Sequence, residues 1–170
     1  MKLTIEQVLT DFYKDQMVSF MENHPEYFEE TLQLAISDKH PYAWRAAWLS
    51  YHCMEENDCH VQKYIPQIID NIKTKKDGHQ RELVKILLKM DLNEEQEGRM
   101  LDCCMDLWEM INKAPSVRYI AFTYIIRLAK RYPELANEVK FLIEDHYLDT
   151  LSPGIKNSIR KMAQQFYKQL

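Results

Sequence analysis

The residues best suited to bind a metal ion lie in one short stretch, His52-Cys53 followed by Cys59-His60. Cysteine thiolates and histidine imidazoles are the usual ligands of zinc. Their spacing differs from that of zinc fingers, in which two ligand pairs such as Cys-x-x-Cys are well separated along the chain. The acidic run Glu55-Glu56-Asn57-Asp58 between them instead indicates a loop from one helix end to the next helix start. The sequence therefore predicts no metal site, and no motif in it calls for a cofactor.

Two tryptophans, Trp44 and Trp48, are four residues apart, which places both indoles on one face of a helix. Such a pair could stack a base or flank a ligand pocket. More often it fills the gap between adjacent helices, and we interpret both indoles as core. The adjacent pair Cys103-Cys104 is interpreted in the same way, because Cys104 falls on an apolar stripe.

Basic residues gather at two places, Lys73–Lys76 and Arg127–Arg131. Each group falls in or just beyond the last turn of a predicted helix, where cations complement the helix dipole and cap carbonyl groups. The whole chain has 22 Lys and Arg against 26 Asp and Glu, a formal net charge of −4. This balance removes the usual driving force for binding phosphates, so a nucleic-acid partner is disfavoured.

No pairing of a nucleophile with a base is evident. The six histidines mostly mark predicted helix ends, and no serine sits in a nucleophile elbow. Carboxylates are expected on solvated helix faces and become catalytic candidates only in a shared, dry cleft. With three glycines, Gly78, Gly98 and Gly154, the chain cannot form a Gly-rich phosphate loop. These observations favour a protein that is not an enzyme.

The sequence also bears on the compartment. No stretch approaches the roughly 20 apolar residues of a membrane span. The first residues lack the long apolar run and cleavage site of a signal peptide. The four cysteines lie in or beside helical patterns and suit a reduced chain, so we expect a cytoplasmic protein with no membrane partner.

Apolar residues recur with helical period along nearly the whole chain, and no segment has the alternation of a strand. Thr4-x-x-Gln7 and Asn93-x-x-Gln96 resemble capping boxes, and Pro66 should kink its helix or mark its true start. One segment, 115–131, is apolar on two faces and should lie between neighbours. The pattern predicts nine helices, over residues 4–21, 25–37, 41–54, 59–74, 78–90, 94–112, 115–131, 133–147 and 153–169.

The helices pair with a fixed period. Basic residues stand early in the first helix of each pair and are separated by 36, 37 and 38 residues: Arg45, Arg81, Arg118 and Lys156. A period of this size with two helices per unit indicates an α-solenoid. We therefore predict an all-α protein, a single domain over residues 1–170, with about four helical hairpins and a C-terminal capping helix.

The repeating units resemble HEAT repeats, most clearly in PYAWRAAWLSYHCM, YIPQIIDNI and APSVRYIAFTYIIRLAKRYPELANEVKFLIED. The resemblance implies a non-catalytic scaffold or adaptor that binds another protein through a concave surface. Two alternatives share Trp- and Arg-rich first helices with this chain. One is the HEAT-like DNA glycosylases, for which no matching catalytic acid can be placed here. The other is a lyase-like or chaperone subunit similar to the HEAT-like phycobilin lyases.

In HEAT-like stacks the second helix of each pair usually lines the concave side. The residues of those helices that point away from the core stripe are candidates for partner binding: Gln67, Asp70, Asp102, Asp106, Glu109, Phe141 and Glu144. Most of the charged members are acids, which would steer a basic segment of a partner, with Phe141 as an apolar anchor. The alternative is that these residues are solvated and Phe141 contacts a neighbouring repeat.

Overall fold

The computed structural model describes residues 2–170, and no strand occurs within this range. The chain divides into two compact units, Met1–Asp91 (unit 1) and Leu92–Leu170 (unit 2). The prediction of an all-α fold is confirmed. The prediction of one domain over residues 1–170 stays a prediction. In the described range, no helix is both long and apolar enough to cross a membrane.

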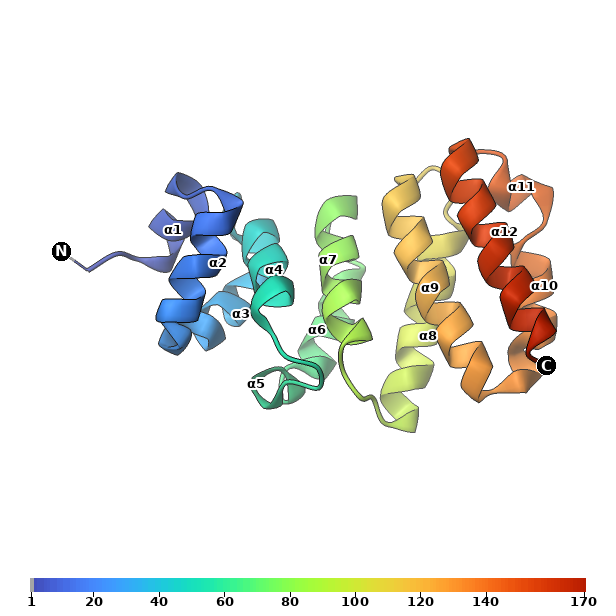
Figure 1. The fold of residues 1–170 in the computed structure, drawn as a ribbon, viewed down its shortest axis with the longest axis horizontal. Coiled ribbons are helices and arrows are strands. Elements are labelled where there is room, and N and C mark those ends of the chain that lie inside the picture. Colours follow the sequence, from blue (N-terminus) through green and yellow to red (C-terminus); the bar gives the residue numbers. More distant parts are fainter. Residues whose placement is uncertain (1) are drawn as a thin grey trace. The chain divides into compact units, whose positions relative to one another are not determined.

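Unit 1 contains seven α-helices and one short 3₁₀ helix within its described residues (Figure 1). Their bounds are α1 Ile5–Asp11, α2 Lys14–Asn23, η1 Pro25–Tyr27, α3 Phe28–Ile36, α4 Tyr42–Cys53, α5 Cys59–Gln62, α6 Ile65–Ile72 and α7 Asp77–Leu88. Helix α4 lies at the centre and packs against α1, α2, α3 and α7. Its buried face is built largely from alanines (Ala43, Ala46 and Ala47), whose small side chains let the neighbouring helices approach closely.

Unit 2 is built around one long helix. Its elements are α8 Glu94–Glu109, α9 Pro115–Arg131, η2 Pro133–Leu135, α10 Ala136–Leu142, α11 Asp145–Leu148 and α12 Pro153–Lys168. Helix α9 packs against α8, α10 and α12 (Figure 1). Phe122 and Ile126, on its second apolar face, are buried. This confirms that the segment 115–131 lies between neighbours.

Four of the predicted helices are broken in the structure. The predicted helix 25–37 is divided into η1 and α3. The predicted helix 4–21 is interrupted at Phe12, which is extended (φ −96°, ψ 147°), and α2 then begins with the Tyr13 N–H bonded to the Gln16 side chain at 2.9 Å. The predicted helix 133–147 is divided into η2, α10 and α11. The predicted helix 59–74 is divided into α5 and α6. Pro66 lies in the first turn of α6, so it marks the true start of a helix, which is one of the two roles predicted for it.

The helical repeat is visible in the hydrogen bonds between neighbouring pairs. Lys89 Nζ donates to the Tyr51 carbonyl, 38 residues away, at 2.9 Å. In unit 2, Trp108 Nε1 donates to the Leu142 carbonyl, 34 residues away, also at 2.9 Å. These separations are close to the period of the sequence pattern, because each bond joins equivalent regions of successive repeats. Arg45, Arg81, Arg118 and Lys156 occupy the fourth or fifth positions of α4, α7, α9 and α12, as predicted.

Candidate functional site

A pocket of about 770 Å³ opens in unit 1, where residues of α1, α2, α4 and α7 meet. We call it the Trp44 pocket and define it by six of its lining residues: Trp44, Arg45, Trp48, Arg81, Glu82 and Lys85. Its volume falls within the range of about 300–1,000 Å³ that is usual for ligand sites. All of its walls belong to unit 1, so its geometry depends on this unit alone.

Trp44 is not a core residue, contrary to the prediction from the sequence. It is 47% exposed. The indole lies instead against the first turn of α7, where a Cβ added at Gly78 would stand 3.4 Å from Trp44 Nε1. The indole therefore packs close to this turn and forms an aromatic wall at the pocket surface.

Trp48 is partly buried and is held by two further contacts. Its ring stacks on His52 with 4.0 Å between centroids and an interplanar angle of 26°. Lys14 Nζ lies 5.1 Å from the centroid of the Trp48 ring, within range of a cation–π interaction. His52, one of the four side chains considered above as zinc ligands, is thus engaged in an aromatic stack beside the pocket.

Charge in the pocket is predominantly positive. Four cationic side chains line it against two carboxylates: Lys14, Arg45, Arg81 and Lys85 against Asp11 and Glu82. Unit 1 as a whole has 11 Lys and Arg against 15 Asp and Glu, a balance of −4. The pocket is therefore a local cationic site in an acidic unit. Arg45 is fixed in it by a bond from Nη1 to the Leu9 carbonyl at 2.9 Å.

Glu82 is the buried acid of the pocket, at 1% exposure. Its Oε1 accepts from Arg81 Nε at 3.2 Å, and Lys85 Nζ lies 3.2 Å from Oε2 as an ion pair. Within the part of the chain that the structure describes, Oε2 accepts no hydrogen bond. Glu82 was not among the candidates predicted from the sequence. In the sequence, Glu82 directly follows the periodic Arg81, whereas Ala46 follows Arg45 and Tyr119 follows Arg118. An acid at this position of the repeat was the signal that could have identified it.

The predicted partner-binding residues are all exposed, but they are divided between the two units. Gln67 and Asp70 lie on α6 of unit 1. The other five, Asp102, Asp106, Glu109, Phe141 and Glu144, lie in unit 2, on α8, on α10 and at the residue before α11.

Three of these acids form what we call the α8 acidic row: Asp102, Asp106 and Glu109. They recur at i, i+4 and i+7, so they share one face of α8. The bond from Trp108 Nε1 to the Leu142 carbonyl joins α8 to the end of α10, which carries Phe141. Phe141 is 59% exposed, so a neighbouring repeat does not cover it.

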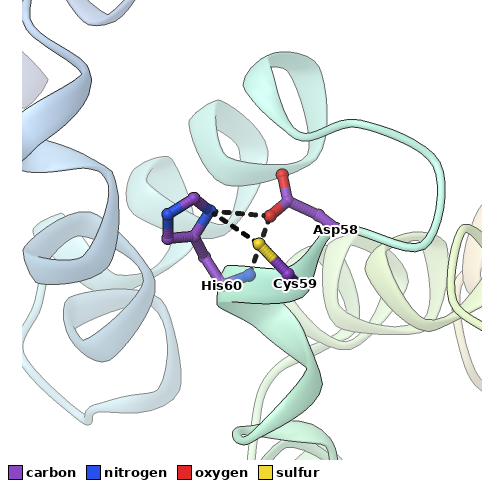
Figure 2. Close-up of side chains that lie close together, drawn as sticks. All are labelled: Asp58, Cys59 and His60. Carbon is purple, nitrogen blue, oxygen red and sulfur yellow. Dashed lines mark hydrogen bonds and ion pairs between the residues drawn. The ribbon is translucent and has the colours of Figure 1, made fainter.

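The cysteine and histidine stretch forms one compact cluster of three consecutive residues, which Figure 2 shows. The ligand atoms of Asp58, Cys59 and His60 lie within 4.8 Å of one another. Asp58 Oδ1 lies 3.0 Å from His60 Nδ1 and also accepts from the His60 backbone N–H at 2.9 Å, which caps α5. Burial raises the pKa of Asp58, but hydrogen bonds from Glu55 and His60 outweigh it and leave the pKa lowered.

Cys53, the remaining candidate in that stretch, does not join the cluster. It is half-buried in the last turn of α4, and burial raises its pKa to about 11. Capping accounts for the geometry of Asp58, and the other two side chains are exposed. That the protein binds no metal ion stays a prediction.

Comparison with known proteins gives one match. The family model for the HEAT repeat domain matches residues 2–166. The match extends through both units and agrees with the repeat period in the sequence. No curated protein and no solved structure matched the chain.

Proposed function

Because this chain belongs to the HEAT repeat family, we propose that it is a non-catalytic scaffold or adaptor that binds another protein in the cytoplasm. HEAT repeats stack into extended surfaces that commonly serve protein recognition. The observation that carries the proposal is the α8 acidic row on unit 2, with the exposed Phe141 on the helix joined to α8. Acids steer a basic segment toward such a surface, and an exposed aromatic residue anchors it.

The test reverses the α8 acidic row. A variant with Asp102, Asp106 and Glu109 changed to lysine should retain its helical content and bind the partner captured from native extract at least ten times more weakly. A matched control reverses three exposed acids of unit 1 and changes the net charge equally: Glu55, Glu56 and Asp91. Equal loss in both variants would indicate a general charge effect, and unchanged binding in the first would refute this surface.

The enzyme alternative receives one supporting observation from the structure. A HEAT-like DNA glycosylase needs an acid in a closed site, and Glu82 is buried in the Trp44 pocket. Duplex DNA would, however, meet a unit with a balance of −4, which opposes phosphate binding. We therefore expect no release of alkylated bases from duplex DNA. Release by the wild type that is lost in Glu82→Gln would establish the alternative.

A further inference from the structure

We propose that the Trp44 pocket is a second binding site, which takes an acidic peptide segment of a partner that carries an aromatic side chain. The α8 acidic row lies in unit 2 and would attract the opposite charge, so this site is independent of it. The inference depends on three features of the pocket: an exposed indole, an excess of cations that are held in place, and a limited volume.

The exposed indole supplies the apolar contact. A tryptophan that is 47% exposed beside a pocket presents a large apolar face to solvent, and such residues are the commonest anchors of binding energy. The first turn of α7 at Gly78 lies close to Trp44 Nε1, Cε2 and Cζ2, and the exposed part of the ring remains open to a ligand. An aromatic side chain stacks well on it, because offset and edge-to-face ring pairs add to the gain from buried area.

The cations supply the preference for acids. Arg81 and Lys85 both pair with the buried Glu82, which fixes their positions at the wall of the pocket. Arg45 is held by the Leu9 carbonyl, and Lys14 by the face of Trp48. Cations that are held in advance lose less side-chain entropy when they bind carboxylates.

Size and surrounding charge favour a short peptide over a nucleic acid. A volume of about 770 Å³ accommodates an aromatic side chain and its flanking residues. A peptide with two or three carboxylates responds mainly to the local excess of cations. A polynucleotide extends its phosphates beyond the pocket, over a unit whose overall balance is −4.

The first experiment selects ligands from a random-peptide library with the whole purified protein. We expect the recovered peptides to combine Asp or Glu with Tyr, Trp or Phe. Titration of a recovered peptide, followed by tryptophan fluorescence or calorimetry, should show at least tenfold weaker binding to Trp44→Ala and near-native binding to Trp44→Phe. The control Phe141→Ala removes an exposed aromatic residue from unit 2 and should bind the peptide normally.

The second experiment tests the charge. Lys14→Glu with Arg45→Gln should weaken peptide binding at least tenfold. Glutamate suits the first turn of α2, and Arg45 is exposed, so the fold should persist, which circular dichroism checks. The control Arg160→Gln with Lys161→Glu makes the same charge change on exposed positions of α12.

Three results would overturn the proposal. The first is recovery of basic or neutral peptides, and the second is equal binding of a recovered peptide by wild type and Trp44→Ala. The third is that a single-stranded oligonucleotide binds more tightly than any recovered peptide and also loses affinity in Trp44→Ala. The triple lysine variant of the α8 acidic row separates the two proposals. If it loses the partner of the α8 acidic row but keeps the selected peptide, the two sites are distinct.

Discussion

Arg118 is a fully buried guanidinium in unit 2. Its Nε donates to the Trp108 carbonyl at 2.9 Å, and its Nη2 to the Tyr147 carbonyl at 2.6 Å. Nη1 reaches the Thr150 hydroxyl at 3.0 Å. One side chain thus joins α8, α9 and α11, and burial lowers its pKa. The same position of the repeat in unit 1, Arg45, is exposed, so the sequence period alone does not distinguish a structural arginine from a surface one.

We predict that Arg118→Met lowers the free energy of unfolding by about 3 kcal/mol. Several buried carbonyl and hydroxyl acceptors would lose a charged donor, and each such loss costs about 1–3 kcal/mol before relaxation. Urea denaturation followed by circular dichroism measures the change. Arg160→Met, on an exposed position of α12, serves as the control and should change stability by less than about 0.5 kcal/mol. A loss below about 1 kcal/mol in Arg118→Met would contradict the structural role.

The burial of His79 makes the stability of unit 1 depend on pH. Its Nε2 lies 2.6 Å from the Ala35 carbonyl. Burial lowers its pKa below the usual 6.5, aided by Lys75 and His40, while the Ala35 bond and Asp38 act in the opposite direction. The unfolded chain therefore binds the proton more readily than the folded one. The contribution of His79 is complete above pH 6.5 and is lost as the pH falls below that value.

We expect the free energy of unfolding to fall between pH 7 and pH 5, with a slope from this residue of at most about 1.4 kcal/mol per pH unit. His79→Gln keeps a donor for the Ala35 carbonyl and should reduce the slope. His146→Gln, at an exposed position, should not. Urea titrations at several pH values measure the slopes, and an unchanged slope in His79→Gln would disprove the assignment.

Helix α8 begins with a complete capping box. Asn93 Oδ1 accepts from the Gln96 N–H at 2.9 Å, and Gln96 Oε1 accepts from the Asn93 N–H at 3.1 Å. We predict that Asn93→Ala destabilises the protein by about 1 kcal/mol and that Asn93→Asp has little effect, because aspartate caps equally well. Thermal unfolding measures both. Equal melting temperatures for wild type and Asn93→Ala would show that the box contributes nothing.

The helices themselves were largely predictable. The capping box of α8 and the apolar period of α8 and α9 locate both helices to within a few residues, because these signals are local. The break at Phe12 was not predictable in this way, since neither proline nor glycine marks it. That break matters for function, because Phe12 and Tyr13 are among the residues that line the Trp44 pocket.

The candidate site was predictable only in part. The exposure of the α8 acidic row follows from the apolar stripe of α8 itself. For Trp44, helical period indicates a face of the helix but not how much of that face its neighbours cover. Glu82 was missed for the same reason. Its burial depends on neighbouring side chains and helices that its own segment does not specify.

Destabilising unit 2 alone tests whether residues 1–170 form a single cooperative domain. If residues 1–170 unfold as one cooperative domain, Arg118→Met should reduce hydrogen-exchange protection in α4 and α7 of unit 1 as well as in α9. In a repeat protein, one repeat stabilises the next only through the interface between them. Exchange measured by mass spectrometry reports each helix separately. Loss of protection confined to residues 92–170 would show that the chain unfolds as two domains.

The four thiols differ greatly in accessibility. Cys103 and Cys104 are buried, and burial raises the pKa of Cys104. Burial raises the pKa of Cys53 to about 11, so this thiol stays protonated and unreactive at pH 7. Cys59, the first residue of α5, is exposed. A maleimide dye or nitroxide label should therefore attach to this one position of the native chain, which gives unit 1 a spectroscopic reporter without any engineered cysteine.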